Sequence, residues 1–184
     1  MKATGIVRRI DDLGRVVIPK EIRRTMRIRE GDPLEIYTDR EGEVIFKKYS
    51  PIGELMEFAA GYAETLYKTC NIPVAVCDKD CIIACAGISK KEFVERKHSM
   101  EIESIIEGRS LYTAPSSPDK RIFLTEDNHN YYVSSAMPIF TEGDVIGCVV
   151  AIGSVDGKFE TLAPEVETKL IQTAAGFLGR QLES

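Results

Sequence analysis

The sequence contains no tryptophan and only two histidines, His98 and His129. Its longest apolar runs, such as Val145–Ile152, are far shorter than the roughly 20 residues that a membrane helix needs. The first ten residues alternate polar and apolar side chains and lack the apolar stretch of a signal peptide. We therefore expect a cytoplasmic protein with no membrane partner.

Sequence motifs for catalysis are also missing. There is no P-loop, no G-x-G-x-x-G after a predicted strand, no G-x-S-x-G, and no cysteine–histidine pair in a suggestive order. Asp119, Glu126 and Asp127 lie near His129, but acidic loop residues of this kind are usually solvated. The sequence predicts a protein that is not an enzyme, with no catalytic residues and no cofactor.

The five cysteines do not form a recognisable site. Cys77, Cys81 and Cys85 have the i, i+4 spacing of one helix face, but their segment has the pattern of a hairpin, in which that spacing has no such meaning. No C-x₂-C pair is present, which argues against zinc. We expect reduced thiols that pack in a core, with no metal site and no disulfide framework.

The charge of the chain is divided unevenly. The 184 residues carry a net charge of -5, yet residues 1–48 hold 12 basic and 9 acidic side chains, and residues 49–184 hold 12 and 20. Seven of the twelve arginines fall between Arg8 and Arg29. A basic cluster at one end of an acidic protein is typical of a nucleic-acid-binding segment. With no tryptophan, and no aromatic residue before Tyr37, double-stranded DNA is favoured over single strands.

The first fifty residues predict a small β-rich domain. We expect a hairpin from residue 5 to 18 around Asp11–Gly14, a two-turn helix after Pro19, and a second hairpin from Leu34–Thr38 and Glu43–Lys48. A segment of this size is marginal without a metal, a disulfide or a partner, and no cysteine or histidine precedes Cys70. The sequence therefore predicts an intertwined homodimer whose core is shared between two chains.

Residues 51–184 predict an α+β domain with an antiparallel sheet. The apolar spacing in Pro51–Thr69 predicts an amphipathic helix within a linker segment 51–70, which either pairs with a symmetry mate or packs on its own domain. The further expected elements are a hairpin, two helices, a loop, three strands and a last helix: Val74–Asp78 with Cys81–Ala86, Ser89–Lys97, Met100–Glu107, Leu111–Lys120, Ile122–Leu124, Tyr131–Phe140, Val145–Ser154 and Pro164–Leu182.

The run Asp11–Arg24, D-D-L-G-R-V-V-I-P-K-E-I-R-R, closely resembles the signature of the AbrB-type swapped-hairpin DNA-binding domain. Residues 51–184 are similar to a GAF domain, most visibly in Val74–Asp78 and in 138–150. The two together resemble sporulation transcription regulators. The resemblance implies interlocked dimers that bind double-stranded DNA through arginines, homotetramers formed through the GAF-like domains and flanking helices, and these DNA-contacting residues: Arg8, Arg15, Arg23 and Arg24.

The guanidinium group suits this role because it is always charged, and its planar fork matches phosphate oxygens and the edge of guanine. Two alternatives stay open: an antitoxin-like module that binds a protein partner, and a metabolite sensor whose first domain only dimerises. In the GAF-like domain, a small-molecule effector near Ser116, Ser117 and the loop 111–120 is as well supported as a filled core that serves assembly.

Overall fold

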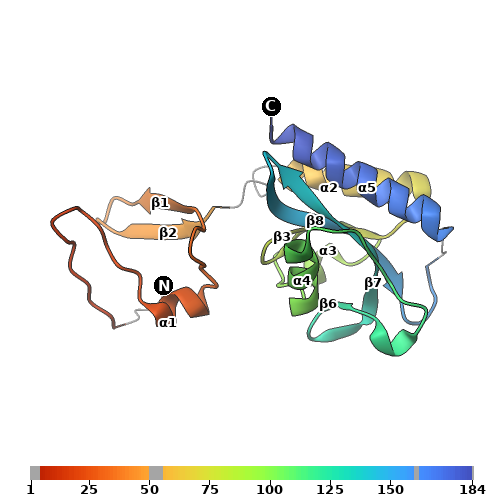
Figure 1. Ribbon diagram of the computed structural model, residues 1–184, viewed down its shortest axis with the longest axis horizontal. Coiled ribbons are helices and arrows are strands. Elements are labelled where there is room, and N and C mark those ends of the chain that lie inside the picture. The colour runs from red at the N-terminus through yellow and green to blue at the C-terminus, as the bar shows by residue number, and fades with distance from the viewer. Residues whose placement is uncertain (1–4, 50–55, 160–161, 184) are drawn as a thin grey trace. The chain divides into compact units, whose positions relative to one another are not determined.

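The computed structural model describes residues 5–49, 56–159 and 162–183. The chain divides into two compact units, Met1–Tyr49 and Ser50–Ser184, which we call the first and second units (Figure 1). The first residues of the helix expected over Pro51–Thr69 lie outside the described residues.

The first unit contains one short helix and one β-hairpin. Helix α1 is Lys20–Thr25, preceded by Pro19, and strands β1, Leu34–Thr38, and β2, Val44–Lys48, pair antiparallel. Asp39 closes the hairpin turn, because its carboxylate oxygen accepts hydrogen bonds from two backbone N–H groups of the turn. The helix and this hairpin match the sequence-based expectation.

The hairpin expected between residues 5 and 18 does not form within the single chain. Only its turn is present: the N–H of Gly14 donates to the carbonyl of Asp11, and the N–H of Asp11 donates to the carbonyl of Arg15, both at 3.0 Å. Gly14 has a φ of 77°, which glycine adopts without strain. The flanking residues form no strand. An isolated two-stranded ribbon is marginal in water unless an apolar face packs on something, and here the apolar side chains lie open: Ile6, Val7, Ile10, Leu13, Val16 and Val17.

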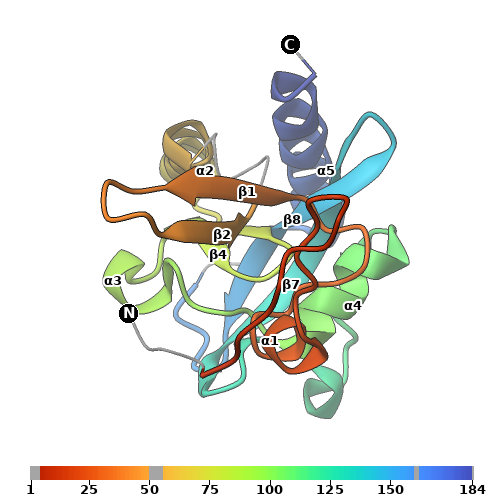
Figure 2. The same cartoon turned by 90° about the vertical axis from the view of Figure 1, so that its left-hand side faces the viewer.

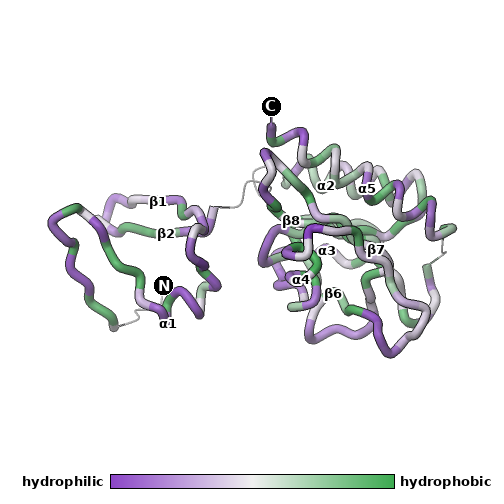
Figure 3. Tube along the Cα trace, viewed as in Figure 1, coloured by the Kyte–Doolittle hydropathy of each residue, from purple (hydrophilic) through white to green (hydrophobic). Residues whose placement is uncertain are grey.

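The first unit has no apolar core of its own. Among residues 5–49, Pro19 alone is buried. Twelve large apolar side chains of this unit are between 36% and 88% exposed. In Figure 3, hydrophobic stretches alternate with hydrophilic ones along this unit's trace.

The second unit is built on a six-stranded antiparallel sheet with the strand order β4-β3-β8-β7-β5, and β6 pairs with β7. A 3₁₀ turn, η2, lies between β5 and β6. The elements are α2 Met56–Cys70, β3 Val74–Asp78, β4 Ile82–Ala86, α3 Lys90–Phe93, α4 Met100–Gly108, β5 Tyr112–Thr113, η2 Pro118–Lys120, β6 Phe123–Thr125, β7 Asn128–Thr141, β8 Asp144–Ser154 and α5 Pro164–Gln181.

Helices cover both faces of this sheet. Helices α2 and α5 lie side by side on one face, and α3 and α4 lie on the other (Figures 1 and 2). Phe177 of α5 stacks on Phe58 and Tyr62 of α2, with ring centroids 5.6 and 5.3 Å apart. The expected α+β class, with its antiparallel sheet and flanking helices, is confirmed. No helix in the described part of the chain is both long and apolar enough to cross a bilayer.

In the second unit, two expected elements differ from the structure. Of the helix expected over Ser89–Lys97, only Lys90–Phe93 is helical. The remainder turns back through Glu95, at a φ of 67°, and pairs with the chain at Ile82, whose N–H donates to the carbonyl of Arg96 at 2.9 Å. The segment 111–120, expected as a loop, contains β5 and η2, because β5 completes the edge of the sheet beside β7.

Candidate nucleic-acid interface

The four predicted DNA-contacting arginines all lie in the first unit, on two kinds of backbone. Arg8 lies in the irregular segment 5–18, and Arg15 follows the turn at Asp11. Arg23 and Arg24 lie on α1. Arg8, Arg15 and Arg24 are exposed, whereas Arg23 is half-buried and its Nε has no hydrogen-bond partner among the described residues.

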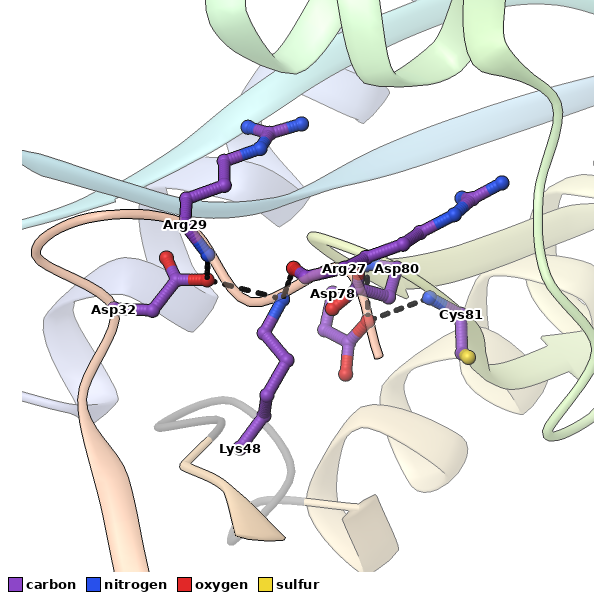
Figure 4. Close-up of polar contacts among 7 residues, drawn as sticks. All are labelled: Arg27, Arg29, Asp32, Lys48, Asp78, Asp80 and Cys81. Atoms are coloured by element: carbon purple, nitrogen blue, oxygen red, sulfur yellow. Dashed lines mark hydrogen bonds and ion pairs between the residues drawn. The ribbon is translucent and has the colours of Figure 1, made fainter. Parts of the chain in front are cut away.

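A group of polar contacts fixes the end of α1 against the second hairpin (Figure 4). The Lys48 ammonium donates to the carbonyl of Arg27 at 3.1 Å and forms an ion pair with Asp32 at 3.3 Å. The backbone N–H of Arg29 donates to the same carboxylate at 2.8 Å. Arg27 has a φ of 52° and ends the helix in the left-handed conformation. These contacts set the direction of α1, and with it the placement of Arg23.

Arg15 is held by its own turn. Its backbone N–H and its Nε each donate to the Asp11 carboxylate at 2.8 Å. The backbone hydrogen bond from Arg15, followed by the bond from its side chain, lowers the pKa of Asp11 below its usual value. The Arg15 side chain is still 68% exposed, so the ion pair orients it and leaves most of its surface open to solvent.

The remaining three arginines have no such carboxylate. Arg8, Arg23 and Arg24 form no ion pair with any residue in the described part of the chain. Asp11 was not predicted as the partner of Arg15, although an aspartate in a turn four residues before an arginine is a local signal for such a pair. The pair of Lys48 and Asp32 was not predicted either, because the two residues lie far apart in sequence.

The cysteines of the second unit lie in its sheet. Cys77 in β3 lies directly opposite Cys148 in β8, and both are buried, as is Cys85 in β4. The neighbouring Cys148 thiol, followed by burial, raises the pKa of Cys77 well above its ordinary value. Cys81 precedes β4, and its N–H donates to the Asp78 carboxylate at 2.6 Å (Figure 4). Within the described ranges, no group of three or more potential ligands is placed to hold a metal ion.

The second unit contains hollows of about 210, 330 and 100 Å³. Ser116 and Ser117, the places expected for a small ligand, line none of these three. Of the loop 111–120, Leu111 and Tyr112 border the open hollow beside α4. The hollow of about 210 Å³ lies elsewhere, between β7, β8 and the start of α5.

Two protein families match the chain. Residues 54–183 match the stage V sporulation protein T C-terminal family, described as a transcription factor. Residues 7–53 match the family described as antidote-toxin recognition MazE, bacterial antitoxin.

Individual relatives agree with this division. The chain is 52% identical to stage V sporulation protein T of Bacillus subtilis (strain 168), over 100% of this chain and 99% of the relative. It is 65% identical over 51 residues to the transition state regulatory protein AbrB of the same strain, over 28% of this chain and 52% of the relative. Among solved structures, the chain is similar to the cofactor-binding GAF domain of the nutrient sensor CodY from Clostridium difficile. The sequence identity is 13% and the TM-score is 0.47, and the match covers 67% of this chain and 83% of that one.

Proposed function

The chain belongs to the stage V sporulation protein T family of transcription factors, and from this premise we propose that residues 1–50 bind double-stranded DNA through Arg8, Arg15, Arg23 and Arg24. It is a sporulation transcription regulator with an AbrB-like domain followed by a GAF-like domain. We assign assembly and effector sensing to residues 51–184, and place the protein in the cytoplasm, where its DNA lies.

One observation carries the DNA-binding proposal: Arg8, Arg23 and Arg24 have no acidic partner among the described residues. Unpaired guanidinium groups within 22 residues of chain give a local positive potential that attracts phosphates, although the whole chain is acidic. The 65% identity over 51 residues to a transition state regulatory protein supports the same role. Phosphate contacts would dominate affinity, and DNA shape and base edges would select the site.

The proposed DNA-binding form is a homodimer that shares one core. The twelve open apolar side chains of the first unit would be covered by the same side chains of a second copy. Among the described residues, the segments on either side of the turn at Asp11 form no strand, and pairing with a second copy would let them complete a sheet. Two copies would then present eight of the proposed contact arginines to one duplex.

The proposed assembly through the second unit is a dimer of dimers. On α2 and α5, large apolar side chains remain between 37% and 49% exposed, although the two helices already pack on each other: Met56, Phe58, Tyr67, Val166 and Phe177. An apolar helix face of this kind fits a second copy of itself about a two-fold axis. Val166→Glu, which puts a charge on that face, should convert tetramers to dimers in analytical ultracentrifugation; an unchanged mass would contradict this interface.

The double variant Arg23→Ala/Arg24→Ala tests the DNA site. If each of the two guanidinium groups contacts one phosphate in both copies of a dimer, the variant loses four contacts. At about -0.9 per phosphate, the slope of log K against log salt should then become shallower by roughly 3.6. The assay is fluorescence anisotropy with genomic fragments that the unmodified protein protects in footprinting.

Arg40→Ala is the matched control. Arg40 is an exposed arginine of the same unit that lies in the β1–β2 turn, outside the arginine cluster. It should leave both the affinity and the slope nearly unchanged. Equal slopes for the unmodified protein and the double variant would disprove the assignment of Arg23 and Arg24.

A second candidate function is favoured by the match of residues 7–53 to an antitoxin family. In that case the first unit would bind a protein partner rather than DNA. Purification of the full chain from its own cells distinguishes the two: a small toxin recovered in equal molar amount supports the antitoxin role, and protected genomic DNA supports the regulator.

A further inference from the structure

A hollow of about 210 Å³ in the second unit is lined by residues of β7, β8 and the first turn of α5. Part of its wall is apolar and comes from three segments of the chain: Ile72 before β3, Ile152 in β8, and Phe159 and Leu162 in the connection from β8 to α5. Two side chains of opposite charge, Arg121 and Glu167, line the same hollow. Neither the sequence motifs nor the proposed DNA site accounts for this arrangement.

The Arg121 guanidinium is positioned but unpaired. It stacks on the ring of Tyr132, 4.1 Å from the ring centroid, and its buried Nε has no hydrogen-bond partner within the described ranges. It forms no ion pair with any described residue. A guanidinium fork that is held by stacking and lacks an anion is suited to bind a carboxylate through two parallel hydrogen bonds.

The backbone of β8 is adapted to this stack. Tyr132 lies opposite Gly153 in the β7–β8 pairing. A Cβ atom at residue 153 would lie 2.2 Å from the Cζ atom of the tyrosine ring, so the ring can lie across β8 only because residue 153 is glycine. The Tyr132 ring that carries the Arg121 guanidinium is therefore packed directly on the backbone of β8.

The carboxylate of Glu167 is also fixed. Its Oε1 accepts hydrogen bonds from the hydroxyls of Ser134 at 2.8 Å and Ser135 at 2.6 Å. Its Oε2 accepts none from the described residues. Glu167 and Arg121 form no ion pair with each other, although both line one hollow. Two fixed, opposite and separate charges in one hollow suit a ligand that carries both complementary charges.

We propose that this hollow binds a free α-amino acid with an apolar side chain. The ligand carboxylate would pair with Arg121, its ammonium group with the free oxygen of Glu167, and its side chain would lie on the apolar wall. A phosphate dianion is disfavoured by the Glu167 charge, and a simple fatty acid would leave that charge unpaired. The volume of about 210 Å³ is also smaller than the roughly 300–1,000 Å³ typical of sites for larger ligands, which favours a small one.

The location of the hollow gives the ligand a route to the helices. Pro73, which follows α2, and Glu167, in the first turn of α5, both line it. A bound amino acid would thus lie beside the C-terminal end of α2 and the N-terminal end of α5, the two helices that we propose for assembly. The proposal that the hollow binds an amino acid does not depend on the DNA site. Only the effect of that ligand on assembly rests on the proposed function.

Isothermal titration calorimetry of the full chain tests the proposal with L-leucine, L-isoleucine and L-valine as probes. At least one should bind. Leucinol, which lacks the carboxylate, and 4-methylpentanoate, which lacks the ammonium group, should bind more weakly than L-leucine by about tenfold to a hundredfold, as expected for the loss of a hydrogen bond to a charged group. No heat with any of the three amino acids, or equal binding of leucinol, would overturn the proposal.

Matched variants locate the site. Arg121→Gln and Glu167→Gln should each weaken binding by a similar factor; the glutamine at 167 can still accept both serine hydroxyls, so the fold is retained. Arg109→Gln and Glu165→Gln are the controls, because both side chains are exposed and neither lines the hollow. Unchanged binding by both test variants, with native circular dichroism, would refute the site. Because calorimetry needs no DNA, its outcome is separate from that of the Arg23→Ala/Arg24→Ala experiment.

Discussion

Two glycines of α5, three residues apart, should respond to alanine in opposite directions. Gly179 is buried, and a Cβ atom there would lie 2.1 Å from the carbonyl oxygen of Phe140 in β7. Gly176 is exposed, and a Cβ atom there would meet nothing within 4 Å. The comparison therefore tests how closely α5 approaches the sheet, with the same chemical change made on the same helix.

The magnitudes follow from helix propensity and overpacking. Replacing a helical glycine with alanine gains about 0.5–1 kcal/mol, which is the whole expected effect at Gly176. At Gly179 the same gain is opposed by a clash of the new Cβ atom with backbone. Overpacking of this kind typically lowers the free energy of unfolding by about 1–3 kcal/mol. Because a strand backbone cannot rotate away as a side chain can, we take the upper end and expect a net loss of roughly 2 kcal/mol.

Urea unfolding followed by circular dichroism measures both changes. The midpoint should rise for Gly176→Ala and fall for Gly179→Ala with little change in slope, and the two melting temperatures should differ by roughly 5–10 °C. Gly61→Ala in α2, where a Cβ atom also meets nothing within 4 Å, is a second control that should behave like Gly176→Ala. A Gly179→Ala protein as stable as the unmodified one would refute the close packing of α5 on β7.

Three further predictions concern charges and thiols. Hydrogen bonds from the Lys158 ammonium, followed by Ser154, lower the pKa of Asp156 from 3.8 to about 2. The stabilisation of the fold by this ionised carboxylate is therefore complete above pH 3.8 and is lost as the pH falls towards 2. In Lys158→Met, an NMR titration of Asp156 should give a midpoint closer to 3.8. In the folded protein Cys81 should react with a thiol reagent before Cys77, whose buried thiol has a raised pKa. Lys48→Met removes the ion pair and the hydrogen bond that hold α1 to β2, and we expect weaker DNA affinity with an almost unchanged salt slope, measured by anisotropy.

Local signals were sufficient for much of the second unit. The β3–β4 and β7–β8 hairpins were predictable because each turn lies between two apolar runs that pair with each other. The segment after Phe93 has a similar polarity pattern to the helix before it, and only the hydrogen bonds at Ile82 show that it returns to the sheet. Periodicity within one segment does not contain that information.

Of the two proposed sites, one was visible in the sequence and the other was not. The arginine cluster was visible in the sequence because its members lie within 22 residues of one another. Arg121 and Glu167 are 46 residues apart and match no motif, so the hollow that they line became apparent only when β7, β8 and α5 were placed together. The expected first hairpin does not form within one chain, and in the proposed dimer its packing partner would come from a second copy.

The lack of an interior in the first unit has a consequence for dosage. For the proposed dimer, the number of dimers competent to bind an operator depends on how often two chains meet, so at low abundance that number rises with the square of the number of chains per cell. A regulator of this kind stays silent while its synthesis is slow, and becomes active over a narrow range of expression. The open apolar side chains of the first fifty residues would thus make gene control respond to a threshold amount of protein.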